Sequence, residues 1–157
     1  MAEKSIEQVI SEHPFFAGLS DRSLEFLAAC ATERELAEDE VLFRYGASAD
    51  AFYLVLSGRI TVEVSAIQGP PLELQNLGPD AILGWSWLIP PYTWHFQARA
   101  EEPAELLVFD GDAVLRHCEN DPAFGYDLFK RFSGLMSERL AAAREKMMNE
   151  WSPPGFA

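Results

Sequence analysis

The middle of the chain, residues 34–109, alternates short β-type segments with turn residues, and this pattern limits the folds open to it. The segments are rich in β-branched and aromatic residues, and Gly or Pro stands in most of the intervening turns. Many short strands at regular spacing predict a barrel or sandwich rather than a parallel sheet. Gly46 and Gly58 fall in turns that require a positive φ. The expected strands cover residues 41–44, 51–56, 60–66, 72–77, 94–100 and 104–109.

Both ends of the chain have helical periodicity instead. In the first part, Ser20 is a suitable cap for a second short helix. Later, Asp110 or Asp112 can cap another short helix, and Pro122 suits the first turn of a long one. The length of the chain fits one domain with its own core. We therefore predict an α+β fold in a single domain: helices over 1–32, a double-stranded β-helix (jelly-roll) barrel over 33–109, helices over 110–149 and a tail at 150–157.

The long C-terminal helix is expected to outreach the barrel. A helix of about 28 residues spans about 40 Å, and apolar residues recur along it every three to four positions. We expect homodimerisation through this helix, with simple packing on the barrel as the alternative. The residues expected at the dimer contact are Leu128, Phe132, Leu135 and Leu140.

The charge balance excludes several classes of partner. The chain has 25 acidic and 12 basic side chains, for a net charge of −13. A surface this negative repels phosphate groups, so we expect no nucleic acid partner of this chain alone and no membrane. The N-terminus lacks the apolar segment of a signal peptide, and no run approaches a membrane span, which favours a cytoplasmic location. Cys30 and Cys118 match no metal-ligand spacing and are expected to be reduced structural thiols.

The order of turns, glycines and helix entry carries a family resemblance. It begins with HPFFAGLS (13–20) and continues through VLFRYGASADAFYLVLSGRITV (41–62). This order resembles the cyclic-nucleotide-binding domains of the catabolite activator and fumarate–nitrate regulator superfamily. The block at 84–100 is similar to that of a subgroup of bacterial single-domain members. The resemblance implies a jelly-roll fold and a sensor or regulatory role without catalysis.

The resemblance also implies a phosphate-binding segment, which this chain alters. Gly84 is kept, but the glutamate that holds the ribose hydroxyl in the family is replaced by Trp85. The arginine that pairs with the cyclic phosphate falls on Trp94 or His95. Because a buried phosphate without a cation is costly, cyclic AMP is not expected to bind in the usual way. Arg99 can substitute as a phosphate ligand or, as the alternative, pair with Glu101 or another acid at the surface.

Aromatic residues are concentrated where this site is lost. Trp94 and Phe96 are expected on one face of a strand, with His95 and Gln97 on the other. The cluster can form a flat-walled pocket for a planar or apolar effector of unknown identity, or it can fill the vacated pocket as closed core. The candidate pocket consists of Gly84, Trp85, Ser86, Trp87, Tyr92, Trp94, His95, Phe96 and Gln97.

Several functions are compatible with these features. The first is a ligand-responsive sensor that signals through the long helix to a dimer partner or another protein. A dimerising interaction module with a filled, ligand-free pocket is the alternative, and a truncated transcription regulator that lacks its helix-turn-helix is a further one. A metalloenzyme of the cupin type is disfavoured, because His13, His95 and His117 form no H-x-H pair. We therefore expect no catalytic residue, metal or cofactor.

Overall fold

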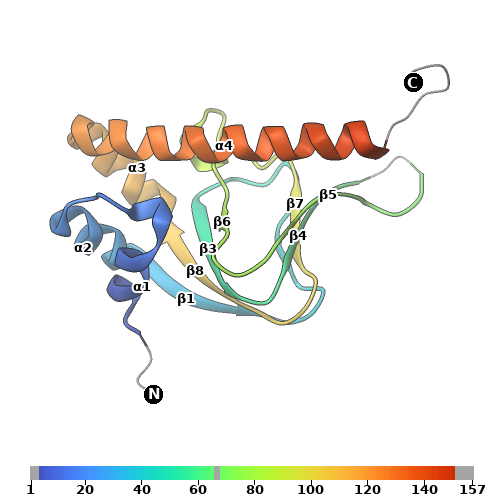
Figure 1. Cartoon of the computed structure of the whole chain (residues 1–157), viewed down its shortest axis with the longest axis horizontal. Coiled ribbons are helices and arrows are strands. Elements are labelled where there is room, and N and C mark those ends of the chain that lie inside the picture. The colour runs from blue at the N-terminus through green and yellow to red at the C-terminus, as the bar shows by residue number, and fades with distance from the viewer. Residues whose placement is uncertain (1–3, 66–67, 151–157) are drawn as a thin grey trace.

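The computed structural model describes residues 4–65 and 68–150, except for the side chain of Glu150. Three helical segments precede the first strand (Figure 1): α1 (Ile6–Glu12), a 3-10 turn (Pro14–Phe16) and α2 (Asp21–Ala29). Ser20 caps α2 as predicted, since its side chain accepts a hydrogen bond from the Ser23 N–H. The prediction of helix up to residue 32 is wrong by three residues. Cys30 ends α2, and Ala31 already pairs with Phe109 in a sheet, so strand pairing outweighs the local helical pattern.

The strands form two four-stranded antiparallel sheets within the described residues, in the jelly-roll arrangement. The first sheet has the order β1-β8-β3-β6 and the second the order β2-β7-β4-β5. The predicted fold class is confirmed, although the strands form two sheets and not one closed barrel. The strands are β1 (Ala31–Leu36), β2 (Val41–Phe43), β3 (Ala51–Ser57), β4 (Ile60–Val64), β5 (Leu72–Leu77), β6 (Ile82–Leu83), β7 (Gln97–Ala100) and β8 (Ala104–Asp110).

The strand predicted at 94–100 begins only at Gln97. The preceding residues pair with a loop and not with a neighbouring strand. The Trp94 N–H donates to the Ala47 carbonyl, and the Gly46 N–H donates to the Trp94 carbonyl. The loop before β3 therefore holds Trp94 in place, and the expected strand is shortened at its beginning. Likewise β4 ends at Val64, and residue 66 of its predicted range lies outside the described residues.

Two apolar clusters form the core. One lies between the two sheets and includes Val55, Ile60 and Ala98, which are fully buried. The other lies between the first sheet and the helices and includes Phe52 and Phe109, whose rings stack with centroids 4.4 Å apart. Because alternate residues of a strand face opposite sides, the first sheet contributes to both clusters. The helices are thus needed to cover the outer face of that sheet.

Up to residue 150, two helices follow the last strand. Asp110 caps α3 (Gly111–Asn120) through the Ala113 N–H, and Asp121 accepts from the Phe124 N–H at the start of α4 (Pro122–Glu150). Figure 1 shows α4 running across the molecule, from α3 at its beginning to β5 at its end. Lys146 still donates to the Glu73 carbonyl of β5, so α4 remains over the second sheet nearly to its last turn. None of the helices, over the ranges given above, combines the length and hydropathy of a membrane span.

The residues predicted at a dimer contact lie on different faces of α4. Leu128 and Phe132 are fully buried against their own chain, so their assignment to a dimer contact is wrong. Leu135 is half-buried and packs against the core between the helices and the first sheet. Leu140 is 72% exposed. The beginning of the helix is therefore a core element, and only its later part presents an apolar side chain from this set.

Candidate functional site

An apolar cavity of about 200 Å³ lies between the second sheet, the segment after β6 and α4. The sheets contribute Phe43, Val62, Leu74, Gln75 and Leu83 to its wall. The segment between β6 and β7 contributes Gly84, Trp85, Ser86, Trp94 and Phe96. The helix α4 closes the cavity with Met136, Arg139 and Ala143, and the largely exposed Leu140 lies at its edge.

Gly84 and Trp94 meet at the floor of this cavity. Gly84 has a φ of +100°, and a Cβ placed on it would lie 2.9 Å from Cη2 of Trp94. The Trp94 ring is buried and stacks on Phe43, with centroids 3.8 Å apart and planes 10° apart. The backbone of Gly84 is therefore approached by an indole ring of the same chain.

Four of the nine predicted pocket residues lie elsewhere. Trp87 is buried among the helices, where its Nε1–H donates to the Gly84 carbonyl at 3.1 Å. Tyr92 and His95 are exposed. Gln97 points to the outer side of the second sheet and donates to Glu63 at 2.9 Å. The predicted cluster is thus divided: Gly84, Trp85, Ser86, Trp94 and Phe96 line the cavity, and the other four do not.

Arg99 lies on the outer side of the second sheet, away from the cavity. Its guanidinium is 2.8 Å from Asp39 and 3.3 Å from Glu63, whose side chain is nearly buried. The predicted pairing of Arg99 with an acid is present, with Asp39 and Glu63 as partners in place of Glu101. The hydrogen bond from Arg99 to Glu63 raises the pKa of the guanidinium. Arg99 is therefore committed to ion pairs and does not line the cavity.

Arg139 is the charged residue among the cavity residues that the sequence did not predict. Its Nη2 donates to the Ile82 carbonyl at 2.5 Å and its Nη1 donates to Gln75 Oε1 at 3.4 Å. Burial lowers the pKa of this guanidinium, against a smaller raising effect of Glu138. A signal was present in the sequence, because Arg139 continues the spacing of the buried residues Leu128 and Phe132 on α4. An arginine on the apolar stripe of a helix is unlike the solvated arginines of the polar side.

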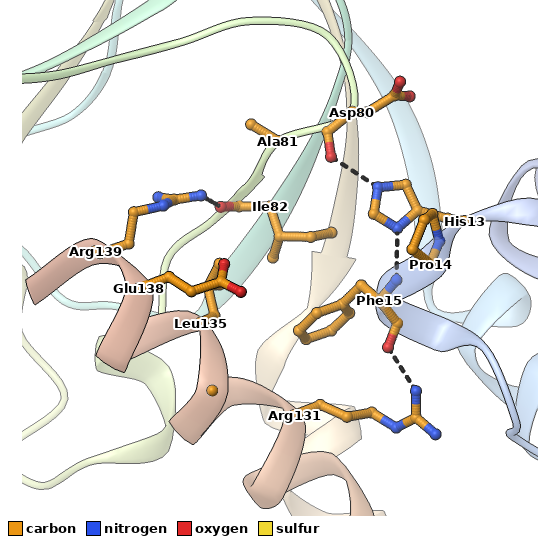
Figure 2. Close-up of a pocket in the computed structure, with 11 residues that line it drawn as sticks. His13, Pro14, Phe15, Asp80, Ala81, Ile82, Arg131, Leu135, Glu138 and Arg139 are labelled. Carbon is orange, nitrogen blue, oxygen red and sulfur yellow. Dashed lines mark hydrogen bonds between the residues drawn. The ribbon is translucent and has the colours of Figure 1, made fainter. Parts of the chain in front are cut away.

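A second cavity of about 470 Å³ lies on the other side of Arg139, between the N-terminal helices, residues 80–82 and α4 (Figure 2). His13 bridges two segments there: its Nδ1 accepts from the Phe15 N–H at 3.0 Å, and its Nε2 lies 2.7 Å from the Asp80 carbonyl. Arg131 donates to the Phe15 carbonyl and pairs with Asp127. These polar groups already have partners within the chain, so the contacts fasten the N-terminal segment to α4.

His117 and the cysteines have structural surroundings. The His117 ring stacks on Phe26 with centroids 3.9 Å apart, so it is half-buried between α2 and α3 and not a plain surface residue. Cys118 is buried and Cys30 is half-buried, and both are free thiols. Over residues 4–65 and 68–150, no cluster of three His, Cys, Asp or Glu side chains is suited to hold a metal ion.

Comparisons with known proteins agree with this architecture. A candidate cyclic nucleotide-binding protein from Geobacter metallireducens is 28% identical, with a TM-score of 0.78 over 88% of this chain and 99% of that one. The catabolite activator protein of Thermus thermophilus is 25% identical, with a TM-score of 0.67 over 85% of this chain and 61% of that one.

This chain is also similar to part of a longer protein and to a protein-family model. The acetyltransferase Pat of Mycolicibacterium smegmatis is 31% identical over 130 residues, which are 82% of this chain but 37% of the acetyltransferase. Residues 33–121 match the cyclic nucleotide-binding domain family. This match spans more than half of the chain and contains all eight strands described above except the first two residues of β1. The chain therefore belongs to the cyclic nucleotide-binding domain family.

Proposed function

We propose that this chain is a non-catalytic sensor domain whose apolar cavity binds a small effector. The observation that carries the proposal is the cavity itself, which lies at Gly84, Trp85 and Trp94, the positions that the resemblance assigns to ligand binding. Its wall is apolar and aromatic with a few polar groups, which is the usual composition of a small-molecule site. The contacts of α4 with the cavity give the effector a direct route to the helix.

A cyclic nucleotide bound in the usual way does not suit this cavity. Sites for drug-sized ligands usually have volumes of about 300–1,000 Å³, whereas this cavity measures about 200 Å³. Trp94 occupies the space beside Gly84, and His95, the other candidate for the family arginine, is exposed. An effector of one or two rings fits better, because apolar cavities of about 150 Å³ bind benzene.

We also propose that α4 mediates homodimerisation. Its outer side presents Tyr126, Leu140, Met147 and Met148, each more than 60% exposed. Side chains three, four and seven positions apart share one side of a helix, so Leu140 and Met147 form a single patch. Exposed apolar patches of this kind are typical of protein contacts. A regulator of which this chain is the sensor part is an alternative, since the chain matches 61% of the Thermus catabolite activator.

Thermal unfolding with added ligands tests the sensor proposal. We expect no shift of the midpoint with cyclic AMP or cyclic GMP, and a rise with the small neutral probe methyl benzoate. A probe at about 100 times its Kd adds about 2.7 kcal/mol of stability, which raises the midpoint by roughly 5–10 °C.

A pair of α4 variants locates the binding. Ala143→Phe places a ring in the cavity and should abolish the shift, whereas Ala142→Phe, at an exposed neighbouring position, should leave it unchanged. A shift with either cyclic nucleotide would contradict the proposal. An unchanged midpoint with every probe would favour the ligand-free interaction module instead.

A further inference from the structure

The single basic residue in the wall of the apolar cavity limits which effectors can bind there. Among the described residues that line it, Arg139 alone carries a positive charge. The same guanidinium borders the second cavity, so it lies between the two spaces. Its position on the sheet-facing side of α4 leaves its side chain half-buried, and burial lowers the pKa of the guanidinium.

The charge of Arg139 is not neutralised within the described parts of the chain. No carboxylate there lies within 4.0 Å of its guanidinium, in contrast to Arg99 and Arg131. Figure 2 shows the guanidinium turned toward Ile82, with the Glu138 carboxylate directed away from it. A cation that is partly removed from water and bonded only to neutral oxygens is held at a cost, which an anion in the cavity would offset.

The remaining donors of Arg139 suit a carboxylate. A guanidinium has five N–H donors, and two of them are used by the Ile82 carbonyl and Gln75 Oε1. The others remain for a ligand, and the guanidinium fork matches the two oxygens of a carboxylate. One cation also sets the ligand charge, because the second charge of a dianion would be left unpaired in an apolar space.

The rest of the cavity determines the body of the ligand. Phe43 and Trp94 form a stacked aromatic wall, and Trp85 and Phe96 add two more rings. Flat aromatic surfaces favour planar partners, which stack on them with an offset or meet them edge to face. The volume of about 200 Å³ leaves room for one or two rings beside the guanidinium.

We propose that the effector is a small aromatic monocarboxylate, whose carboxylate pairs with Arg139 and whose ring lies against Trp94 and Phe43. This inference rests on the proposed sensor function and names the chemical class of its ligand. Since Arg139 also bonds Ile82 and Gln75, an anion at its guanidinium acts directly on the contact of α4 with β5 and β6.

Calorimetric titration with benzoate and with methyl benzoate tests the proposal, because the two probes differ in charge and share the ring. We expect benzoate to bind the unmodified chain about tenfold or more tightly than its ester, the factor that a charge-assisted hydrogen bond supplies. Arg139→Gln should remove this advantage and leave binding of methyl benzoate within about twofold. Arg144→Gln, at an exposed position on the same helix, is the matched control and should leave both affinities unchanged.

The outcomes of these titrations distinguish the carboxylate assignment from the sensor function on which it rests. Equal affinity for acid and ester, or a benzoate affinity unchanged by Arg139→Gln, overturns the carboxylate assignment while the sensor proposal stands. Failure of both probes to bind the unmodified chain overturns the two together. Should Arg139→Gln not fold, the acid–ester comparison still decides the matter, and Arg139→Lys, which keeps the charge without the fork, should show an intermediate loss.

Discussion

At the scale of single residues, the contact between Gly84 and Trp94 decides the shape of the candidate site. Gly84→Ala should lower the stability of the chain by more than Gly46→Ala. Both glycines have a positive φ, which costs an alanine roughly 1–2 kcal/mol, but a Cβ at Gly84 meets the Trp94 ring and one at Gly46 meets nothing within 4 Å. Urea unfolding of the two variants measures the difference in the free energy of unfolding. Equal losses of stability would show that the Trp94 ring moves aside at no energetic cost.

The buried Tyr53 predicts a specific loss of stability at alkaline pH. Burial, with a smaller effect of Asp50, raises its pKa from 10.0 to about 12. Its contribution is therefore complete below pH 10 and is lost as the pH rises toward 12, because the unfolded chain ionises first. Tyr53→Phe should remove up to about 2 kcal/mol of this alkaline loss.

Urea unfolding of this variant over the alkaline range is the measurement, with Tyr126→Phe, at a 71% exposed position, as the control. Cys118 contributes a loss of the same sign, since burial raises its pKa to about 11, and neither variant alters that part. An unmodified alkaline profile in Tyr53→Phe would rule out the buried phenol as its cause.

The residues of the cavity were only partly predictable. The segment at 84–96 stood out because its aromatic content is high, and five of its predicted residues line the cavity. Leu74 and Arg139, which lie in distant parts of the chain, could not be predicted as cavity residues. They come together only because α4 packs over the second sheet. Trp87 was placed in the pocket by composition, but its indole N–H bonds to the Gly84 carbonyl and turns the ring into the helix-side core.

At the scale of elements, α4 shows where periodicity gives the right answer and where it fails. Its beginning at Pro122 and its length agree closely with expectation. Of the apolar residues expected at a dimer contact, Leu128 and Phe132 are buried in the core of their own chain, whereas Leu140 is exposed. With 3.6 residues per turn, a stripe of apolar residues drifts around a long helix, so the later apolar residues lie on another side.

The exposed side of α4 predicts self-association. Leu140→Glu combined with Met147→Glu should shift the chain toward the monomer, because four charges per dimer would be buried in an apolar contact. Sedimentation velocity over a concentration series measures the change. Leu72→Glu, at a 53% exposed position on β5, is the control and should leave the association unchanged. A chain that is already monomeric at every concentration before mutation would contradict the prediction.

The predicted strand boundaries are wrong where pairing with a distant segment decides them. β1 is absent from the expected strands, and β7 begins later than the local sequence predicts. In each case the backbone partner determines where the strand begins. Ala31 pairs with Phe109 in the first sheet, and the backbone of Trp94 forms its hydrogen bonds with the loop at Gly46. Pairing between segments distant in the chain cannot be obtained from the composition of one segment.

At the scale of the whole molecule, the fold was predictable because the positions of its turns can be recognised in the sequence. The predicted positive φ occurs at Gly46 and Gly58, and a Cβ at Gly58 would collide with the backbone of Pro103 and Ala104. Such positions fix where strands reverse, and the order of strands follows from them. The side chains between the second sheet and α4 carry no comparable constraint, because no positive φ or close backbone approach dictates most of them. The family of this chain is therefore clearer than its effector.

Leu140 belongs to two surfaces at once, as part of the cavity wall and as a side chain 72% exposed on the outer side of α4. A second chain that covered Leu140 would complete the wall from outside. The two equilibria would then be reciprocal: pairing would change effector affinity by the same factor by which effector changes pairing. In such a chain, the concentration of a small molecule would set the ratio of paired to unpaired copies.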